Sequence, residues 1–459
     1  MRILASVLCL LSFVLPVAAA PTNLSPKTDE ANPVQLLTNF QRTYLYENDY
    51  AARAKIMKAG TMDGTSISEK TFSGGSPVKL SWKGTTGTCT VSVRKIAGED
   101  GSVAETATVR EGTVVWTGTT SGSSVEVVNL EIGAGYTWTV TDSSKASASA
   151  TFWTSPEPPR LIKTGSMKVM RDMGGWTGTL GGRQYKVRQN QLFRGGPATG
   201  VDEDAKDFFY TVVGVKTELD LRGSSSDKFD TSGTKLKYVG LSRDASYKVS
   251  KEDMDKQGSS FWPNLIKTFE SIFDAAQRPA YFHCSIGRDR TGVTAELTLA
   301  LLGVSLEDIW RDYETSAYKQ TSDIVEKGTY FAGYVRDMAA YKKGYSTFNE
   351  QVEAYFIEDL GFTKEQIETF RTDMLINYGE PPEPPKPTYH VEEPVYVTAT
   401  RITFAAGQST GTQYTGFLTK QGREYAWGKD GEALTDWVRG DGTPCDLKKP
   451  SDDCELMVK

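Results

Sequence analysis

The sequence predicts a multidomain protein in which a β-sandwich precedes an α/β domain with a central sheet flanked by helices. The chain has 459 residues, enough for roughly two to four domains of about 100–200 residues each. Short alternating strands separated by Gly and Ser turns fill residues 61–155, a pattern typical of a sandwich. After a Pro-rich hinge at 155–159, apolar strand-like runs alternate with amphipathic helices over residues 160–378, which indicates the α/β domain.

Composition narrows the function classes. Charged residues make up 24% of the chain and the net charge is −6, which gives no general reason to expect nucleic acid as a partner. The chain has only two histidines, His283 and His390, and no Cys and His cluster with zinc spacing. We therefore expect no metal site and no cofactor, while local basic clusters could still bind an anionic substrate.

Residues 1–20 have the pattern of a secretory signal peptide. Arg2 supplies the positive start, Ile3–Val17 is apolar, and Ala18–Ala20 offers small residues for cleavage. The apolar run is short for a membrane span, and no other segment is apolar enough to be one. We expect an exported protein, periplasmic or secreted, without a membrane span.

The first part after the signal divides into two segments. Residues 21–60 are polar and mixed, and we expect a loose lead-in with one short helix between 33 and 54. In the predicted sandwich, apolar and polar residues alternate with a period of two, which marks half-buried strands. The clearest such runs are Val78–Trp82, Cys89–Val93, Val125–Val127 and Tyr136–Val140.

One run in the predicted sandwich carries a family resemblance. Residues Asn129–Tyr136, with a leucine, a Gly turn and a closing tyrosine, resemble the tyrosine-corner segment of fibronectin type III domains. The resemblance covers about ninety residues. Such a module could contact a surface or a polysaccharide through Trp116, Trp138 or Trp153, although core packing is the expectation for these tryptophans.

The five cysteines have different expected fates. Cys9 would leave with the signal peptide, and Cys89 falls in a predicted strand as a small buried residue. Cys445 and Cys454 are close enough in sequence for a local disulfide. Cys284 is then an odd, unpaired thiol in an exported protein, and a role as a catalytic nucleophile is one explanation for it.

Several elements of the α/β region can be placed. We predict a buried strand at Thr217–Leu221, an amphipathic helix at Phe261–Ala276, and helices at Ser305–Tyr318 and Thr363–Ile376 that begin with N-cap residues. Residues 379–388 form a Pro-rich linker, and residues 389–459 read as a small β module or tail.

The most informative stretch is residues 283–292, His-Cys-Ser-Ile-Gly-Arg-Asp-Arg-Thr-Gly. An apolar run precedes it and a helical pattern follows, which predicts a strand, a tight loop and a helix N-terminus. Backbone N–H groups of such a loop can hold a phosphate dianion. The helix dipole and nearby arginines favour the thiolate form of Cys284.

This stretch resembles the phosphate-binding signature of the cysteine-dependent tyrosine phosphatase superfamily. The form H-C-x-x-G-x-D-R-T-G resembles its bacterial branch of secreted tyrosine and lipid phosphatases. The resemblance spans about 161–378 and includes, in the family's order, R-D-x-G-G at 171–175, L-F-R-G-G at 192–196 with Gly in place of Ser or Thr, D-L-R at 220–222, and I-x-x-D-Y at 309–313.

The resemblance implies metal-independent phosphomonoester hydrolysis through a phosphocysteine. Cys284 would be the nucleophile, Arg290 would grip two phosphate oxygens through its planar fork, and the backbone from Ser285 through Ile286, Gly287, Arg288 and Asp289 to Arg290 would cradle the phosphate. Thr291 would hydrogen-bond the sulfur. We expect His283 to orient the loop rather than to act as a base.

The general acid is less directly indicated. Several tyrosine phosphatases carry it on a Trp-Pro-Asp loop, but this chain has Trp262-Pro263-Asn264. The resembling branch uses the aspartate inside the signature, here Asp289, which could instead brace the loop by pairing with an arginine. Asp244, on a loop after a predicted strand, is the alternative.

Basic residues near the loop have two readings each. Arg171, Arg194 and Arg222 could approach the phosphate or form salt bridges, with Asp172 and Asp220 as their structural partners. Arg288 is compatible with polyanionic substrates but could also be a solvated surface charge.

Phosphotyrosine protein is the favoured substrate, and phosphoinositides or inositol phosphates are the alternative. A phosphatase fold that only binds phosphate, or acts in adhesion, is the alternative of another class.

Overall fold

The structure is a computed structural model. Apart from gaps at 69–70, 98–111, 166, 199, 224–227, 230–235, 245–246 and 317–329, it describes residues 20–379, and then 417–418, 424–425, 436–439 and 454–457. The chain divides into two compact units, 1–379 and 380–459. In the described part of the chain, no helix is long and apolar enough to cross a membrane.

The second unit contributes two antiparallel strand pairs. β17 (Phe417–Leu418) pairs with β18 (Glu424–Tyr425), and β19 (Asp436–Arg439) pairs with β20 (Cys454–Met457). All four strands fall within residues 389–459, where the sequence predicts a small β module or tail. Cys9, Cys445 and the signal peptide lie outside the described residues.

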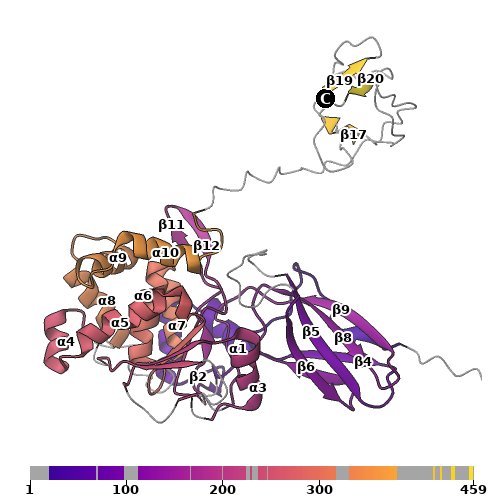
Figure 1. The fold of residues 1–459 in the computed structure, drawn as a ribbon, viewed down its shortest axis with the longest axis horizontal. Helices are drawn as coiled ribbons and strands as arrows, with labels where there is room; N and C mark the ends of the chain where they lie inside the picture. Colours follow the sequence, from indigo (N-terminus) through magenta and orange to yellow (C-terminus); the bar gives the residue numbers. More distant parts are fainter. Residues whose placement is uncertain are drawn as a thin grey trace, which may run out of the picture. The chain divides into compact units, whose positions relative to one another are not determined.

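The first unit contains two sheets that share one core. β1 (Thr22–Ser25), β4 (Val78–Lys83) and β7 (Ser124–Val127) form a three-stranded sheet. A four-stranded sheet has the order β6 (Val114–Thr120), β5 (Cys89–Ala97), β8 (Gly135–Thr141), β9 (Ser147–Trp153). All the pairings are antiparallel (Figure 1). Buried side chains from both sheets form one cluster, which is the architecture of a β-sandwich.

Alternation along the strands explains this core. In β4, Val78, Leu80 and Trp82 are buried while the residues between them are more exposed, because successive side chains point to opposite faces. Cys89 and Trp138 are fully buried, as expected of core residues. The N–H of Glu131 donates to the hydroxyl of Tyr136 over 2.9 Å, which is the hydrogen bond that a tyrosine corner makes.

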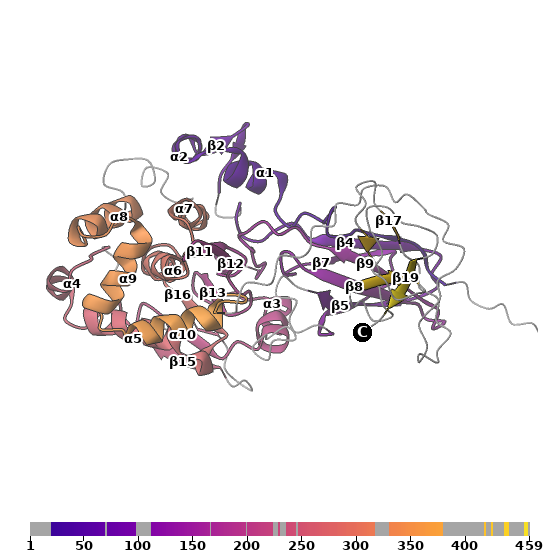
Figure 2. The same ribbon diagram turned by 90° about the horizontal axis from the view of Figure 1, so that it is seen from above.

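The segment expected as a loose lead-in supplies structure to both parts of the first unit. β1 joins the sandwich, and the chain then forms α1 (Asn39–Arg42), the π-helical turn η1 (Thr43–Glu47), α2 (Tyr50–Ala59) and the hairpin of β2 (Thr61–Met62) and β3 (Thr65–Ser66). Figure 2 shows α1, α2 and β2 next to one another. Tyr44, Leu45 and Met57 are completely buried in the core of the α/β part. Phe72 is completely buried in the same core, although the sequence assigned it to the sandwich segment at 61–155. Sequence polarity missed this because the apolar residues are spread over several short elements.

The α/β part is built on a five-stranded sheet. Its order is β10 (Arg171–Asp172), β13 (Leu192–Gly195), β16 (Ala280–His283), β14 (Thr217–Asp220), β15 (Lys237–Gly240), and only β10 is antiparallel to its neighbour. Gly195, His283 and Asp220 are register partners, so the central parallel strands end in one row. Sites in α/β sheets form beyond such carboxyl ends. The hairpin of β11 (Thr177–Leu180) and β12 (Arg183–Lys186) lies outside this sheet.

Helices cover this sheet. They are α3 (Glu203–Asp207) with η2 (Phe208–Val213), α4 (Lys251–Gln257), α5 (Phe261–Phe273) with η3 (Ala275–Gln277), α6 (Asp289–Leu301), α7 (Leu306–Glu314), α8 (Tyr330–Tyr341), α9 (Phe348–Glu358) and α10 (Lys364–Met374). The predicted strand at 217 and the three predicted helices are confirmed within a few residues at their ends. Ser305 and Thr363 cap α7 and α10 as expected, each accepting the N–H three residues later. From Thr291 to Leu301, α6 is buried on all sides (Figure 1).

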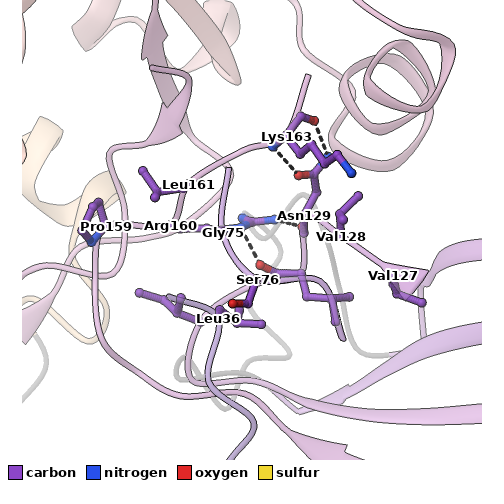
Figure 3. Close-up of a pocket in the computed structure, with 12 residues that line it drawn as sticks. Leu36, Gly75, Ser76, Val127, Val128, Asn129, Pro159, Arg160, Leu161 and Lys163 are labelled. Carbon is purple, nitrogen blue, oxygen red and sulfur yellow. Dashed lines mark hydrogen bonds between the residues drawn. The ribbon is translucent and has the colours of Figure 1, made fainter. Parts of the chain in front are cut away.

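The expected hinge at 155–159 is followed directly by a buried arginine that bonds residues on both sides of the hinge. Arg160, which is 3% exposed, donates from Nε to the carbonyl of Leu130 over 3.0 Å and from Nη1 to Asp172 over 2.9 Å. A small cavity lies beside Arg160, and Asn129 and Lys163 are among the residues that line it (Figure 3). Asn129 and Lys163 are joined by two hydrogen bonds. Asp172 was expected to be a structural partner of Arg171, Arg194 or Arg222, but it pairs with Arg160.

Candidate active site

The predicted strand, loop and helix are all present around Cys284. β16 ends at His283, the loop runs over residues 284–288, and α6 begins at Asp289 with Arg288 as its N-cap. Cys284 is a free thiol that is 3% exposed. It therefore lies between the end of a central strand and the N-terminus of a buried helix, where the positive end of the helix dipole favours an anion.

Gly287 makes the tight loop possible. Its φ is +71°, and a Cβ there would lie 2.5 Å from the carbonyl carbon of Gly195. A Cβ on Gly195 would in turn lie 2.8 Å from Sδ of Met170. The loop thus rests directly on the end of β13. This contact explains why the L-F-R-G-G element has glycine where the family has Ser or Thr.

His283 is fixed by a residue that the sequence analysis did not single out. Its Nε2 lies 2.9 Å from Oε1 of Glu218 on β14, and both side chains are completely buried. The ring of His283 also stacks on Tyr281, with ring centroids 5.0 Å apart. These contacts agree with an orienting role for His283. The available signal for Glu218 was an acidic residue within an otherwise apolar strand.

Arg171 and Arg194 share one buried carboxylate, Asp312 on α7. Arg171 Nε lies 2.7 Å from Asp312 Oδ1, and Arg194 Nη1 pairs with Oδ2. Arg194 Nη2 also donates to the carbonyl of Gly287 over 3.0 Å, and this hydrogen bond ties β13 to the loop at 284–288. Burial alone would raise the pKa of Asp312, but the charges of Arg171 and Arg194 hold it below its ordinary value. Neither arginine is available to a substrate.

Other arginines around the loop are also engaged by protein acceptors. Arg222 makes two bonds to Asp220 at 2.9 and 2.8 Å, the pairing expected from the sequence. Arg243 donates to Thr294 over 2.7 Å. Arg288 is 3% exposed and its Nε bonds Asp289 over 2.9 Å. It is therefore neither a solvated surface charge nor a cation free for a polyanion.

Arg290 differs from these arginines. It lies in the first turn of α6 and is half-buried, and its Nε is buried without a hydrogen-bond partner among the described residues. A guanidinium in this state can turn its donors to a dianion held by the loop. Thr291 Oγ1 is likewise buried without a partner there, so its expected hydrogen bond to the sulfur of Cys284 is not formed in this structure.

The two candidate acids have different surroundings. Asp289 Oδ1 accepts bonds from Arg288 and, over 3.0 Å, from the hydroxyl of Tyr247. Asp244 is half-buried, and its Oδ2 accepts the N–H of Lys248 over 3.3 Å. Trp262-Pro263-Asn264 lies in the first turn of α5 rather than on a loop. Asn264 Nδ2 donates to the carbonyl of Ser242 over 2.8 Å and so holds the loop that carries Asp244.

The comparisons with known proteins show what this part of the chain is similar to. Residues 162–376 match the family model described as the tyrosine phosphatase family. Together with the relatives below, this match supports a cysteine-dependent tyrosine phosphatase-like phosphatase domain. It covers the five-stranded sheet, the Cys284 loop and α6 to α10, and lies outside the sandwich and α1 to β3.

Two curated relatives of this part of the chain are also tyrosine-protein phosphatases by name. A tyrosine-protein phosphatase of Nostoc commune is 28% identical over 159 residues, which is 30% of this chain and 52% of that protein. A protein of Cupriavidus necator whose name assigns it to the tyrosine-protein phosphatases is 29% identical over 163 residues, 31% of this chain and 58% of that protein. The chain thus spans somewhat more than half the length of these relatives.

One solved structure is also similar. The core catalytic domain of a PP-IP phosphatase from S. cerevisiae, solved in complex with citrate, is 15% identical with a TM-score of 0.22. The likeness covers 34% of this chain and 93% of that one.

Among all the residues that the structure describes, no group of three or more His, Cys, Asp or Glu side chains could hold a metal ion.

Proposed function

We propose that this protein is an exported, metal-independent phosphatase that hydrolyses phosphomonoesters through a phosphocysteine, with phosphotyrosine protein as its substrate. The observation that carries the proposal is the pairing of two unengaged groups at one helix N-terminus. Cys284 is a free thiol there. The guanidinium of Arg290 makes no hydrogen bond or ion pair to a described residue, and its Nε is buried. The Nε of Arg194 is also unpartnered, but its Nη1 and Nη2 are bonded, and the other arginines around the loop likewise donate to protein acceptors.

The first step transfers the phosphoryl group to sulfur. The thiolate of Cys284 attacks phosphorus, an S–P bond forms, and the bond from phosphorus to the ester oxygen breaks. The fork of Arg290 and the N–H groups of the loop stabilise the charge on the equatorial oxygens. Asp289, protonated, gives its proton to the leaving oxygen, and its Oδ2 is the oxygen for this because Oδ1 already accepts two hydrogen bonds.

The second step regenerates the thiolate. Water attacks phosphorus, its proton passes to Asp289, the S–P bond breaks, and inorganic phosphate leaves. Thr291 Oγ1, buried and unpartnered, is the donor available to stabilise the leaving sulfur after a small rotation. Every proton and electron pair of this cycle is carried by the substrate, water, Cys284 and Asp289.

The state of Arg288 favours a substrate with one phosphate group. A polyanionic inositol phosphate would need further free cations beside the loop. Arg288 was the residue that made a polyanionic substrate plausible from the sequence. Its Nε is instead paired with Oδ1 of Asp289 at 2.9 Å. A phosphotyrosine presents one dianion and an aromatic ring, which needs no second phosphate site. Phosphoinositides remain the alternative that the substrate test distinguishes.

Cys284→Ser tests the proposal, with Cys89→Ser as a matched control because Cys89 is a free cysteine buried in the sandwich. We expect reduced wild-type protein and Cys89→Ser to hydrolyse p-nitrophenyl phosphate, and Cys284→Ser to lose at least 10³-fold in kcat/KM. A wild-type protein that binds phosphate without turnover would instead indicate a phosphate-binding module. Rates on a phosphotyrosine peptide, a phosphoinositide and inositol hexakisphosphate then identify the substrate class.

The sandwich enters the proposal as a fibronectin type III-like module. Its three- and four-stranded sheets and the Tyr136 hydrogen bond support that likeness. Trp138 is completely buried and belongs to the core, so a surface or polysaccharide contact would have to use other residues. Export rests on residues 1–20. Fractionation of cells that express the full chain, compared with a chain lacking these residues, tests it.

A further inference from the structure

Tyr247 occupies a backbone conformation that tyrosine rarely adopts. Its φ is +57°, in the left-handed region, where the Cβ of a non-glycine residue crowds the backbone. It lies after β15 on the loop that also carries Asp244, and its side chain is 5% exposed. Such a conformation persists only where the surroundings enforce it, so the contacts of this side chain matter.

The hydroxyl of Tyr247 forms a hydrogen bond to Asp289, which is distant in sequence. It donates to Asp289 Oδ1 over 3.0 Å, although the two residues are 42 positions apart. The hydroxyl of Tyr313 on α7 lies 3.3 Å from that of Tyr247. A phenol has one proton to donate, so Tyr247 gives its proton to Asp289 and accepts the one from Tyr313. Burial raises the pKa of both phenols, which keeps them protonated as donors.

Asp289 is thereby held on one side only. Both hydrogen bonds that its carboxyl accepts within the described chain go to Oδ1, one from Arg288 and one from Tyr247. The side chain of Asp289 is 20% exposed, so the carboxyl remains accessible from the loop. Oδ2 is left as the oxygen that can carry and release a proton.

We propose that Tyr247 is a positioning residue that locks the Asp289 carboxyl in one rotamer, with Oδ2 turned toward the leaving group. This inference rests on the proposed function, because it assigns Tyr247 to the acid step of that reaction. Tyr313 supports it by orienting the Tyr247 hydroxyl. Tyr247 itself contacts no reacting atom in this arrangement.

The test uses two substrates that differ in their need for a proton. The nitrophenolate of p-nitrophenyl phosphate leaves without protonation, whereas an alkoxide does not. We expect Tyr247→Phe to lower kcat/KM on an alkyl phosphate at least tenfold and to change kcat/KM on p-nitrophenyl phosphate less than threefold. We compare kcat/KM because it reports the phosphoryl transfer to Cys284 and not the later hydrolysis, which is common to both substrates. The matched control is Tyr334→Phe, since the buried hydroxyl of Tyr334 has no partner in the described structure and its ring lies 6.4 Å from that of Tyr247.

A double variant separates positioning from a structural effect. If Tyr247 acts through Asp289, Tyr247→Phe adds no further loss on the alkyl phosphate in an Asp289→Asn background. Equal losses on both substrates, or a loss that adds to that of Asp289→Asn, overturns the positioning role. The proposed function is read separately. It fails if Cys284→Ser stays active, and its acid assignment fails if Asp289→Asn itself affects both substrates equally.

Discussion

Replacing Arg53 by methionine tests whether the segment before the sandwich is part of the core of the phosphatase domain. Arg53 on α2 is completely buried. Its Nε lies 2.6 Å from Oε2 of Glu314, which is also completely buried, its Nη2 lies 2.9 Å from Glu307, and its Nη1 donates to the carbonyl of Asn48. The variant would leave Glu314 with the hydroxyl of Tyr44 at 3.3 Å as its remaining partner in the described structure.

The expected loss follows from this geometry. Removing one partner of a buried ion pair leaves an uncompensated charge and costs about 3–5 kcal/mol of unfolding free energy. Methionine retains most of the apolar volume, so little of the loss would come from a cavity. For a domain of this size the loss corresponds to a fall in Tm of roughly 6–20 °C.

Denaturant unfolding of wild type and three variants measures this. Lys55→Ala is the matched control because Lys55 is exposed on the same helix, and we expect it to change the unfolding free energy by less than about 0.5 kcal/mol. Adding Glu314→Gln to Arg53→Met should recover a large part of the loss, because the buried charge is then gone. An Arg53→Met protein as stable as Lys55→Ala would refute the reasoning and would mean that α2 does not dock in solution as it does here.

Three further predictions concern two buried carboxyl groups and one loop glycine of the phosphatase domain. Asp312→Asn should lower the unfolding free energy by about 3–5 kcal/mol at pH 7, and because the pKa of Asp312 is held low, this difference from wild type should shrink in unfolding curves as the pH falls below about 4. Glu296 is completely buried with both carboxylate oxygens unpartnered in the described structure, and burial raises its pKa well above the ordinary value. Its contribution to stability is therefore full below about pH 4.3 and is lost as the pH rises, so Tm of Glu296→Gln relative to wild type should increase from pH 5 to pH 8; a constant difference would contradict this. Gly287→Ala should lower kcat/KM on p-nitrophenyl phosphate at least tenfold, since the added Cβ meets Gly195 at 2.5 Å, whereas Gly344→Ala, with open space around it, should not.

Much of the local structure could be predicted from the sequence. Period-two alternation placed β4 and β8, and capping residues placed the starts of α7 and α10, because these patterns depend on neighbours within a few positions. The strand, loop and helix around Cys284 followed in the same way, and the unpaired cysteine beside a glycine turn identified the candidate site. Glu218 was missed because a single acidic residue in a strand has no pattern of its own.

The pairing of charged groups could not be predicted. Asp172 was expected to pair with one of Arg171, Arg194 and Arg222, but it pairs with Arg160. Arg171 pairs with Asp312, 141 positions away. The role of Arg288 was left between solvent and substrate, and the structure gives it to Asp289 instead. A buried charge takes the nearest opposite charge in space, since an unpaired one costs several kcal/mol.

The sequence by itself thus determined the candidate nucleophile and the loop that we propose to bind phosphate, because both depend on residue types within ten consecutive positions. Only the tertiary structure decided which arginine stays uncommitted, which side of Asp289 is held by Tyr247, and that the residues before the sandwich complete the core around α7. Those decisions depend on contacts between residues 42 to 261 positions apart. Such contacts are set by packing and by the cost of burying unpaired charge, and no local periodicity records them.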